Sequence, residues 1–432
     1  MSDAEVRDPL GLRSWLRRAP ALPFSLYAVF AAFTTYFCMY GFRKPYAVAE
    51  YEGQTLGGFD LKYALIISQL LGYALSKYVG IKVCSEITPA RRAVTLIGLI
   101  LVAELALVFV GLAPPALQVV AIFFNGLPLG MIWGLVFSFL EGRRTSDLLG
   151  AGLSCSYIVA SGAVKSVGKV WLQQGVSESW MPAVTGLTFL LPLLLGVWLL
   201  QQLPAPSAAD VAARSERTAM DSRMRWGFLG NHLAGMLPLL VLYFFLTAYR
   251  DFRDNFSAEI WRDLGYGDQA AVFTVPELYI AFGVMSCLGL IYLVKRNRPA
   301  VMAVYGMMIA GVAMVGLATL GFDAGAIGGR AWMTLVGLGL YLAYVPFGCV
   351  LFDRLVALLG TPGNAVYAIY LTDALGYTGS VGVNLYKVLG HGDLPELQFF
   401  RGFSYLTAGL CLVAFLFSLR AFLRRAPAGS EP

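Results

Sequence analysis

Long apolar runs alternate with short polar segments along nearly the whole chain. Each run is about twenty residues long, the length that an α-helix needs to cross the hydrocarbon core of a bilayer. The pattern therefore predicts an all-α membrane protein with twelve transmembrane helices. We place these spans at 23–47, 60–80, 94–113, 116–140, 149–172, 181–203, 228–257, 271–294, 300–321, 330–353, 364–389 and 399–422.

The polar segments between the runs differ in charge. Lysine and arginine gather before the first span, after every even-numbered span and at the C-terminal end, whereas the other loops carry almost none, with Arg262 as the main exception. Positive residues favour the cytoplasmic side of a membrane. We therefore expect an even number of spans, with the N- and C-termini in the cytoplasm.

The segment 204–225 is the only long polar stretch, and it divides the predicted spans six and six. Each half also contains Tyr-Phe followed by an arginine at the same spacing, Tyr36-Phe37 before Arg43 and Tyr243-Phe244 before Arg250. These features predict two pseudo-symmetric six-helix bundles. The expected organisation is a cytoplasmic N-terminal segment at 1–22, bundles at 23–203 and 228–422, a cytoplasmic linker at 204–227 and a cytoplasmic tail at 423–432.

Composition supports a membrane protein and narrows the function classes. Hydrophobic residues make up 58% of the 432 residues and charged residues 13%, about half of what soluble domains carry. The six cysteines are scattered without a CxxC pair, and the two histidines lie far apart, so no metal site is expected. There is no phosphate-binding loop and no nucleophile–base pattern. We expect no enzyme activity, no cofactor and no nucleic-acid partner, and we expect a monomer.

Several charged residues fall inside the predicted spans, where a charge costs about 2.5–3.5 kcal/mol on insertion scales. The cations outnumber the acids by three, and an unpaired buried cation favours an anionic ligand. The cations are Arg43, Lys44, Lys77, Lys165, Lys169, Arg250, Arg253 and Lys387, and the acids are Glu104, Asp251, Asp254, Glu277 and Asp373.

Arg43 and Lys44 close the first span, directly before Pro45. An arginine fork beside a lysine can hold a phosphate or carboxylate. Alternatively, both side chains end the helix and reach the outer interface. Lys77 lies toward the inner end of the second span, where the same interfacial interpretation applies.

Arg250, Asp251, Arg253 and Asp254 form a dense cluster in the seventh span. Arg250 and Asp254 are one helical turn apart and could neutralise each other. In a functional interpretation, Arg250 exchanges this carboxylate for substrate.

Lys165 and Lys169 are also one turn apart, so they repel unless an anion or a carboxylate from another helix lies between them. Asp373 and Glu277 are the most central acids. Each either pairs with a nearby cation or carries a coupling proton. Glu104 is interpreted as a lone polar residue on a packing face.

Four short stretches resemble the organophosphate:phosphate antiporters, the glycerol-3-phosphate and hexose-phosphate carriers of the major facilitator superfamily. They are Tyr40-Gly41-Phe42-Arg43-Lys44, Gly72-Tyr73-Ala74-Leu75-Ser76-Lys77-Tyr78 with Arg91-Arg92, Tyr249-Arg250 with Ser257, and Phe352 to Val383 with Leu375-Gly376-Tyr377. The resemblance implies that Arg43 and Arg250 face each other across a central cavity and bind phosphate, with Lys77 nearby. The fifth-helix histidine of the glycerol-phosphate carriers has no counterpart in Ser154 to Ser161.

The expected function is secondary active transport of a small, phosphorylated organic anion by alternating access. Phosphate antiport or proton coupling would drive it, in a bacterial cytoplasmic membrane. The expected substrate-binding residues are Arg43, Lys44, Lys77, Lys165, Arg250 and Arg253, and the expected coupling or charge-pair residues are Asp251, Asp254, Glu277 and Asp373. The alternative is a membrane sensor that keeps the transporter fold and binds an organic phosphate without moving it.

Overall fold

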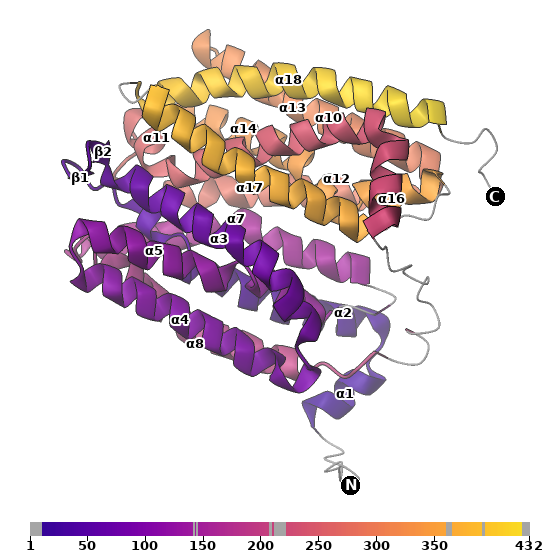
Figure 1. Ribbon diagram of the computed structural model, residues 1–432, viewed down its shortest axis with the longest axis horizontal. Helices are drawn as coiled ribbons and strands as arrows, with labels where there is room; N and C mark the ends of the chain where they lie inside the picture. The colour runs from indigo at the N-terminus through magenta and orange to yellow at the C-terminus, as the bar shows by residue number, and fades with distance from the viewer. Residues whose placement is uncertain are drawn as a thin grey trace.

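The computed structural model describes residues 11–140, 143, 146–206, 210, 222–359, 365–390 and 394–425. These residues are almost entirely helical (Figure 1). Within them, the one sheet is a small antiparallel hairpin of β1 (Thr55–Leu56) and β2 (Phe59–Asp60), in which Thr55 pairs with Asp60.

The helices form two groups that lie side by side (Figure 1). The first group contains α2 (Ala21–Met39), α3 (Leu61–Glu86), α4 (Arg92–Leu112), α5 (Pro115–Leu129), α6 (Ile132–Ser138), α7 (Ser146–Gln173) and α8 (Met181–Gln201). The second contains α10 (Ser222–Asn255), α11 (Ser257–Asp263), α12 (Val275–Tyr292), α13 (Asn297–Asp323), α14 (Gly329–Tyr344), α15 (Pro346–Cys349), α16 (Leu351–Leu359), α17 (Ala365–Gly390) and α18 (Glu396–Arg425). We call them the N-bundle and the C-bundle.

Short 3-10 turns join several of these helices, and α1 (Leu12–Arg18) precedes the N-bundle. The turns are η1 (Tyr40–Phe42), η2 (Pro45–Val48), η3 (Pro89–Arg91) and η4 (Ala270–Phe273). The predicted linker at 204–227 lies mostly outside the described residues, as do the beginning of segment 1–22 and the end of tail 423–432. The C-bundle begins at Ser222, six residues before the predicted start at 228.

Within the described ranges, nine helical segments are long and apolar enough to cross a membrane. The helices α3, α7 and α17 are not among the nine, although they contain 26, 28 and 26 residues. At 1.5 Å per residue, even 26 residues extend about 39 Å, more than the hydrocarbon core of a bilayer. These three helices carry charged residues, including Lys77, Lys165 and Asp373. The protein is thus an all-helical membrane protein, and the twelve-span topology and the side of the termini remain predictions.

Large apolar side chains are exposed on the outer faces of both bundles. Val94 and Leu191 of the N-bundle are 73% and 77% exposed, and Phe282 of the C-bundle is 76% exposed. Such residues are stable at the surface of a protein when lipid surrounds it. The apolar outer faces leave the contact between the bundles as the place for buried charged residues such as Lys44, Lys165 and Asp254.

The two ends of the molecule differ (Figure 1). α1 and α16 lie at one end, and the β1–β2 hairpin and α11 lie at the other. We call the latter the hairpin end. α3 runs beside α17, and α7 packs against η4 and α12, so these elements make the contact between the bundles.

Candidate functional site

The first long helix, α2, ends before it reaches Arg43, so backbone groups near Arg43 lack the hydrogen bonds of a continuous helix. α2 stops at Met39, and η1 and η2 continue the chain with Pro45 at the start of η2. Carbonyls freed by the break need other donors. Asn125 Nδ2 donates to the Phe42 carbonyl at 2.9 Å, and Gln69 Nε2 donates to the Arg43 carbonyl at 2.8 Å. Buried amides from α5 and α3 therefore hold the segment that carries Arg43 and Lys44.

Arg43 is buried, and no carboxylate of the described residues pairs with it. It is only 3% exposed, and its Nε has no hydrogen-bond partner. Its guanidinium lies 3.8 Å from the centre of the Tyr73 ring and 5.7 Å from that of Tyr40. Among the described residues, Arg43 forms no ion pair, although a charge at this depth is costly. The interpretation that it reaches the membrane interface is therefore wrong for this conformation.

The carboxylate of Asp254 in α10 forms ion pairs between the two bundles. Lys44 Nζ lies 2.6 Å from Asp254 Oδ2, and Lys165 Nζ lies 2.5 Å from Oδ1. Lys44 also donates to Asn255 Oδ1 at 2.7 Å, and Lys165 donates to Ser257 Oγ at 3.0 Å. Two cations of the N-bundle thus share one anion of the C-bundle. The sequence argument required a carboxylate from another helix to offset the repulsion between Lys165 and Lys169. Asp254 is such a carboxylate.

Arg250 pairs with Asp251 rather than with Asp254, contrary to the spacing argument. Its Nη2 lies 2.7 Å from Asp251 Oδ1. It also donates to the Tyr344 hydroxyl and lies over that ring, 4.5 Å from its centre. Ser380 of α17 donates to the other oxygen of Asp251 at 2.6 Å. The pairing differs because Asp254 faces the two lysines of the N-bundle, whereas Asp251 and Arg250 face α14 and α17.

The two remaining predicted acids each meet a cation. Arg253 Nη2 lies 2.8 Å from Glu277 Oε1 inside the C-bundle. Lys77 Nζ lies 3.2 Å from Asp373 Oδ2, which joins α3 to α17 between the bundles. Both acids are therefore engaged with cations in this conformation.

A small pocket lies where α7 meets the C-bundle. Lys165, Arg253, Asp254 and Glu277 are among its lining residues. Two cations face two acids there, so the pocket itself is balanced in charge. Arg43, Lys77 and Arg250 do not line this pocket, so it contains only part of the predicted site.

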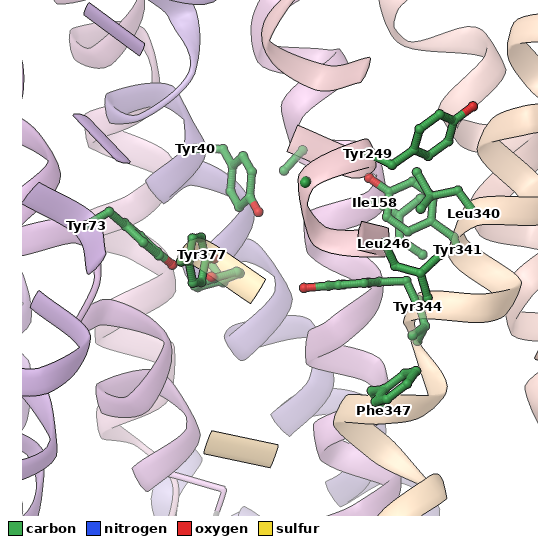
Figure 2. Close-up of a cluster of buried hydrophobic side chains, with 14 of the residues drawn as sticks. Tyr40, Tyr73, Ile158, Leu246, Tyr249, Leu340, Tyr341, Tyr344, Phe347 and Tyr377 are labelled. Atoms are coloured by element: carbon green, nitrogen blue, oxygen red, sulfur yellow. The ribbon is translucent and has the colours of Figure 1, made fainter. Parts of the chain in front are cut away.

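Tyrosines occupy the region between Arg43 and Arg250. The rings of Tyr73 in α3 and Tyr377 in α17 are 5.0 Å apart, and Arg250 lies 5.9 Å from the Tyr377 ring. Figure 2 shows Tyr40 and Tyr344 on opposite sides of this region, with their hydroxyl ends directed into it. Because Arg43 stacks on Tyr73, the two arginines approach a shared, tyrosine-lined region from the two bundles. These tyrosines were not predicted as site residues, because a tyrosine in an apolar run carries no charge that marks it as unusual.

A second set of contacts between the bundles lies toward the hairpin end. Lys62 of α3 forms a buried ion pair with Glu259 of α11. Arg262 pairs with Glu50, and Tyr63 donates to Glu396 Oε1 at 3.1 Å. The pairs were missed because residues at the ends of spans are expected at the interface, where water or headgroups can satisfy them.

Comparison with solved structures identifies the fold. The D-xylose–proton symporter matches with a TM-score of 0.64 at 14% identity, over 96% of this chain and 100% of that chain. A bacterial homologue of the human lysosomal transporter Spinster, in an inward-facing and unoccupied conformation, matches with a TM-score of 0.64 at 12% identity, over 95% and 100%. The nucleoside transporter NupG matches with a TM-score of 0.58 at 12% identity, over 92% and 99%.

At these identities the likeness establishes the fold alone, which this chain shares with these transporters. No curated protein sequence matches the chain. A protein family described as "Family of unknown function (DUF5690)" matches residues 45–425. Because this match covers most of the sequence, the chain is a member of the family of unknown function DUF5690.

Proposed function

We propose that the protein is a secondary active transporter of a small phosphorylated organic anion, which it exchanges for inorganic phosphate. The observation that carries this proposal is the buried guanidinium of Arg43, which has no carboxylate partner among the described residues. The fold supports transport in general, since the matched structures are transporters. The phosphate assignment extends the resemblance to the organophosphate antiporters.

The charges of the predicted site favour a ligand with about two negative charges. Its six cations face four carboxylates, so these acids leave two positive charges unbalanced. A phosphate monoester carries about −1.5 to −2 charges at neutral pH, whereas a monocarboxylate carries one. A phosphate group therefore fits the balance better than a simple carboxylate.

The proposed binding region lies between Arg43 and Arg250. Arg43 presents a guanidinium fork, which suits two oxygens of one phosphate. Arg250 already contacts the Tyr344 hydroxyl, so a phosphate there would meet guanidinium and phenol donors together. An anion bound between Arg43 and Arg250 would contact both bundles and offset the positive charge of each arginine.

Alternating access would then require the contacts at the hairpin end to break and reform. The pairs of Lys62 with Glu259 and of Arg262 with Glu50 lie at that end and would hold it closed. We propose that the termini lie in the cytoplasm, so that this conformation is closed to the outside. The twelve-span topology and a bacterial cytoplasmic membrane belong to the same proposal.

Counterflow of labelled inorganic phosphate tests this function. Purified protein in liposomes loaded with unlabelled phosphate should accumulate labelled phosphate, and external phosphate monoesters should compete better than dicarboxylates. Arg43→Gln should reduce counterflow by about 10- to 200-fold at low phosphate, the equivalent of about 1.5–3 kcal/mol for hydrogen bonds to a charged group.

Arg401→Gln is the matched control. Arg401 pairs with Asp323, and its side chain is 39% exposed, so its loss should leave counterflow within about twofold of wild type. Retained counterflow in Arg43→Gln would remove Arg43 from the site. Saturable phosphate binding without any counterflow would instead identify a sensor with the transporter fold.

A further inference from the structure

Glu104 is a buried acid that the proposed anion site does not use. It lies in the middle of α4 and is 5% exposed. Neither of its carboxyl oxygens has a hydrogen-bond partner. It differs in this respect from Asp251, Asp254, Glu277 and Asp373, which all lie against cations.

The elements packed against α4 offer Glu104 no counter-charge nearby. α5, α6 and α8 contain no charged or titratable residue at all. η1 contributes the phenol of Tyr40, and η3 contributes Arg91. Arg91 and Arg92 stand at the beginning of α4, 13 and 12 residues before Glu104, or about 18–20 Å along the helix. No ion pair of Glu104 exists among the described residues.

An ionised carboxylate in such surroundings costs far more than a neutral carboxylic acid. Glu104 therefore takes the neutral form in this arrangement, with its proton kept away from water. A change that admitted water or a cation would favour the ionised form. Glu104 thus has the environment of a group that binds and releases one proton as the structure changes.

Glu104 is also connected to the segment that carries Arg43. Its carboxyl group and the Phe42 ring both lie against Gly186 of α8, where a Cβ would collide with the carboxyl and lie 3.2 Å from the ring. Asn125 donates to the carbonyls of Phe42, at 2.9 Å, and of Ala103, at 3.0 Å. A movement of η1 that shifts Arg43 would therefore alter the packing around Glu104.

We propose that Glu104 is the proton-binding residue that couples transport to a proton gradient. The carboxylate takes up a proton from one side of the membrane and returns it to the other side as η1 moves. This inference rests on the proposed transport function and adds a proton to the exchange, so that a proton gradient can also drive it; Glu104 carries this proton, in place of Asp373 or Glu277.

The proton on Glu104 can be tested without any substrate. Infrared spectra of the full-length protein in lipid at neutral pH should contain the C=O stretching band of a protonated carboxyl group. Glu104→Gln should remove this band, whereas Glu52→Gln, which changes a side chain that is 79% exposed, should keep it. An unchanged band in Glu104→Gln would overturn the proposal whether or not the protein transports phosphate.

Coupling is tested by two assays on the same proteoliposomes. A one-unit inward proton gradient should drive wild-type protein to accumulate labelled phosphate up to about tenfold for one coupled proton. Glu104→Gln should retain phosphate exchange and lose this gradient-driven accumulation. Gradient-driven accumulation in Glu104→Gln, or equal loss of both activities, would overturn the coupling role. Absence of exchange in the wild type would contradict the proposed function, with the infrared result still deciding whether Glu104 carries a proton.

Discussion

Lys165 of α7 and Asp254 of α10 form an ion pair between the two bundles, with Nζ 2.5 Å from Oδ1. Lys44 binds the other oxygen of the same carboxylate. Asp254 therefore forms ion pairs with two cations that belong to the opposite bundle. In the proposed alternating-access cycle, this arrangement would make Asp254 a central determinant of the state in which the two bundles are in contact.

Asp254→Asn should destabilise the protein strongly. It would leave Lys44 and Lys165 buried without their shared counter-charge, and breaking a buried pair by removing one partner costs about 3–5 kcal/mol. Thermal unfolding in detergent should therefore begin at a clearly lower temperature. Asp323→Asn, which removes one half of a more exposed pair with Arg401, should cost no more than about 1 kcal/mol. Equal stability of the two variants would show that the pairs of Asp254 contribute little.

Glu259→Gln should loosen the closure at the hairpin end. The substitution removes the charge that holds Lys62, and Lys62 also donates to the Ala47 carbonyl at 3.0 Å. A cysteine placed at fully buried Ala47, in a protein whose native cysteines are replaced, should then react faster with a membrane-impermeant maleimide. Arg401→Gln, which affects a pair inside the C-bundle, should leave the rate unchanged in the same background. A rate in Glu259→Gln equal to that of the parent would mean that this pair does not keep the end closed.

The Tyr73 ring should contribute to anion binding through Arg43. The guanidinium lies 3.8 Å from the ring centre, and such a contact stabilises by about 0.5–2 kcal/mol. Tyr73→Leu should therefore raise the half-saturating phosphate concentration for counterflow by about 2- to 30-fold. Tyr73→Phe keeps the aromatic face and should remain much closer to wild type. If the leucine variant matched the phenylalanine variant, the ring would not position Arg43.

Two glycines of α17 should respond oppositely to alanine. A Cβ at Gly379 would lie 2.6 Å from the Phe244 carbonyl of α10, so Gly379→Ala should force the helices apart and lower stability. A Cβ at Gly382 would meet only the tip of Phe244, at 4.0 Å. Gly382→Ala should be neutral or stabilising by up to about 1 kcal/mol, because alanine favours a helix over glycine. Thermal unfolding of both variants checks this contrast, which a loss of stability in Gly382→Ala would contradict.

The helical membrane architecture could be predicted from local sequence. A run of about twenty apolar residues has few stable alternatives to a membrane-spanning helix, because every backbone polar group must be satisfied within it. For the same reason, Arg43 and Arg250 could be recognised as unusual: each is a charge within an apolar run, and both follow Tyr-Phe at one spacing. Neither inference requires knowing which helices are neighbours.

The pairing of charges could be decided only by the tertiary structure. Helical spacing suggested that Arg250 neutralises Asp254, yet Asp254 binds Lys44 and Lys165 from the other bundle. Coulomb attraction depends on distance in space, and α7 and α10 meet only after the two bundles have assembled. Helix packing likewise left Arg43 against aromatic rings and, inside the N-bundle, left Glu104 among apolar helices. The sequence alone thus determined that charges would be buried, whereas packing between distant helices determined which of them would lack a partner.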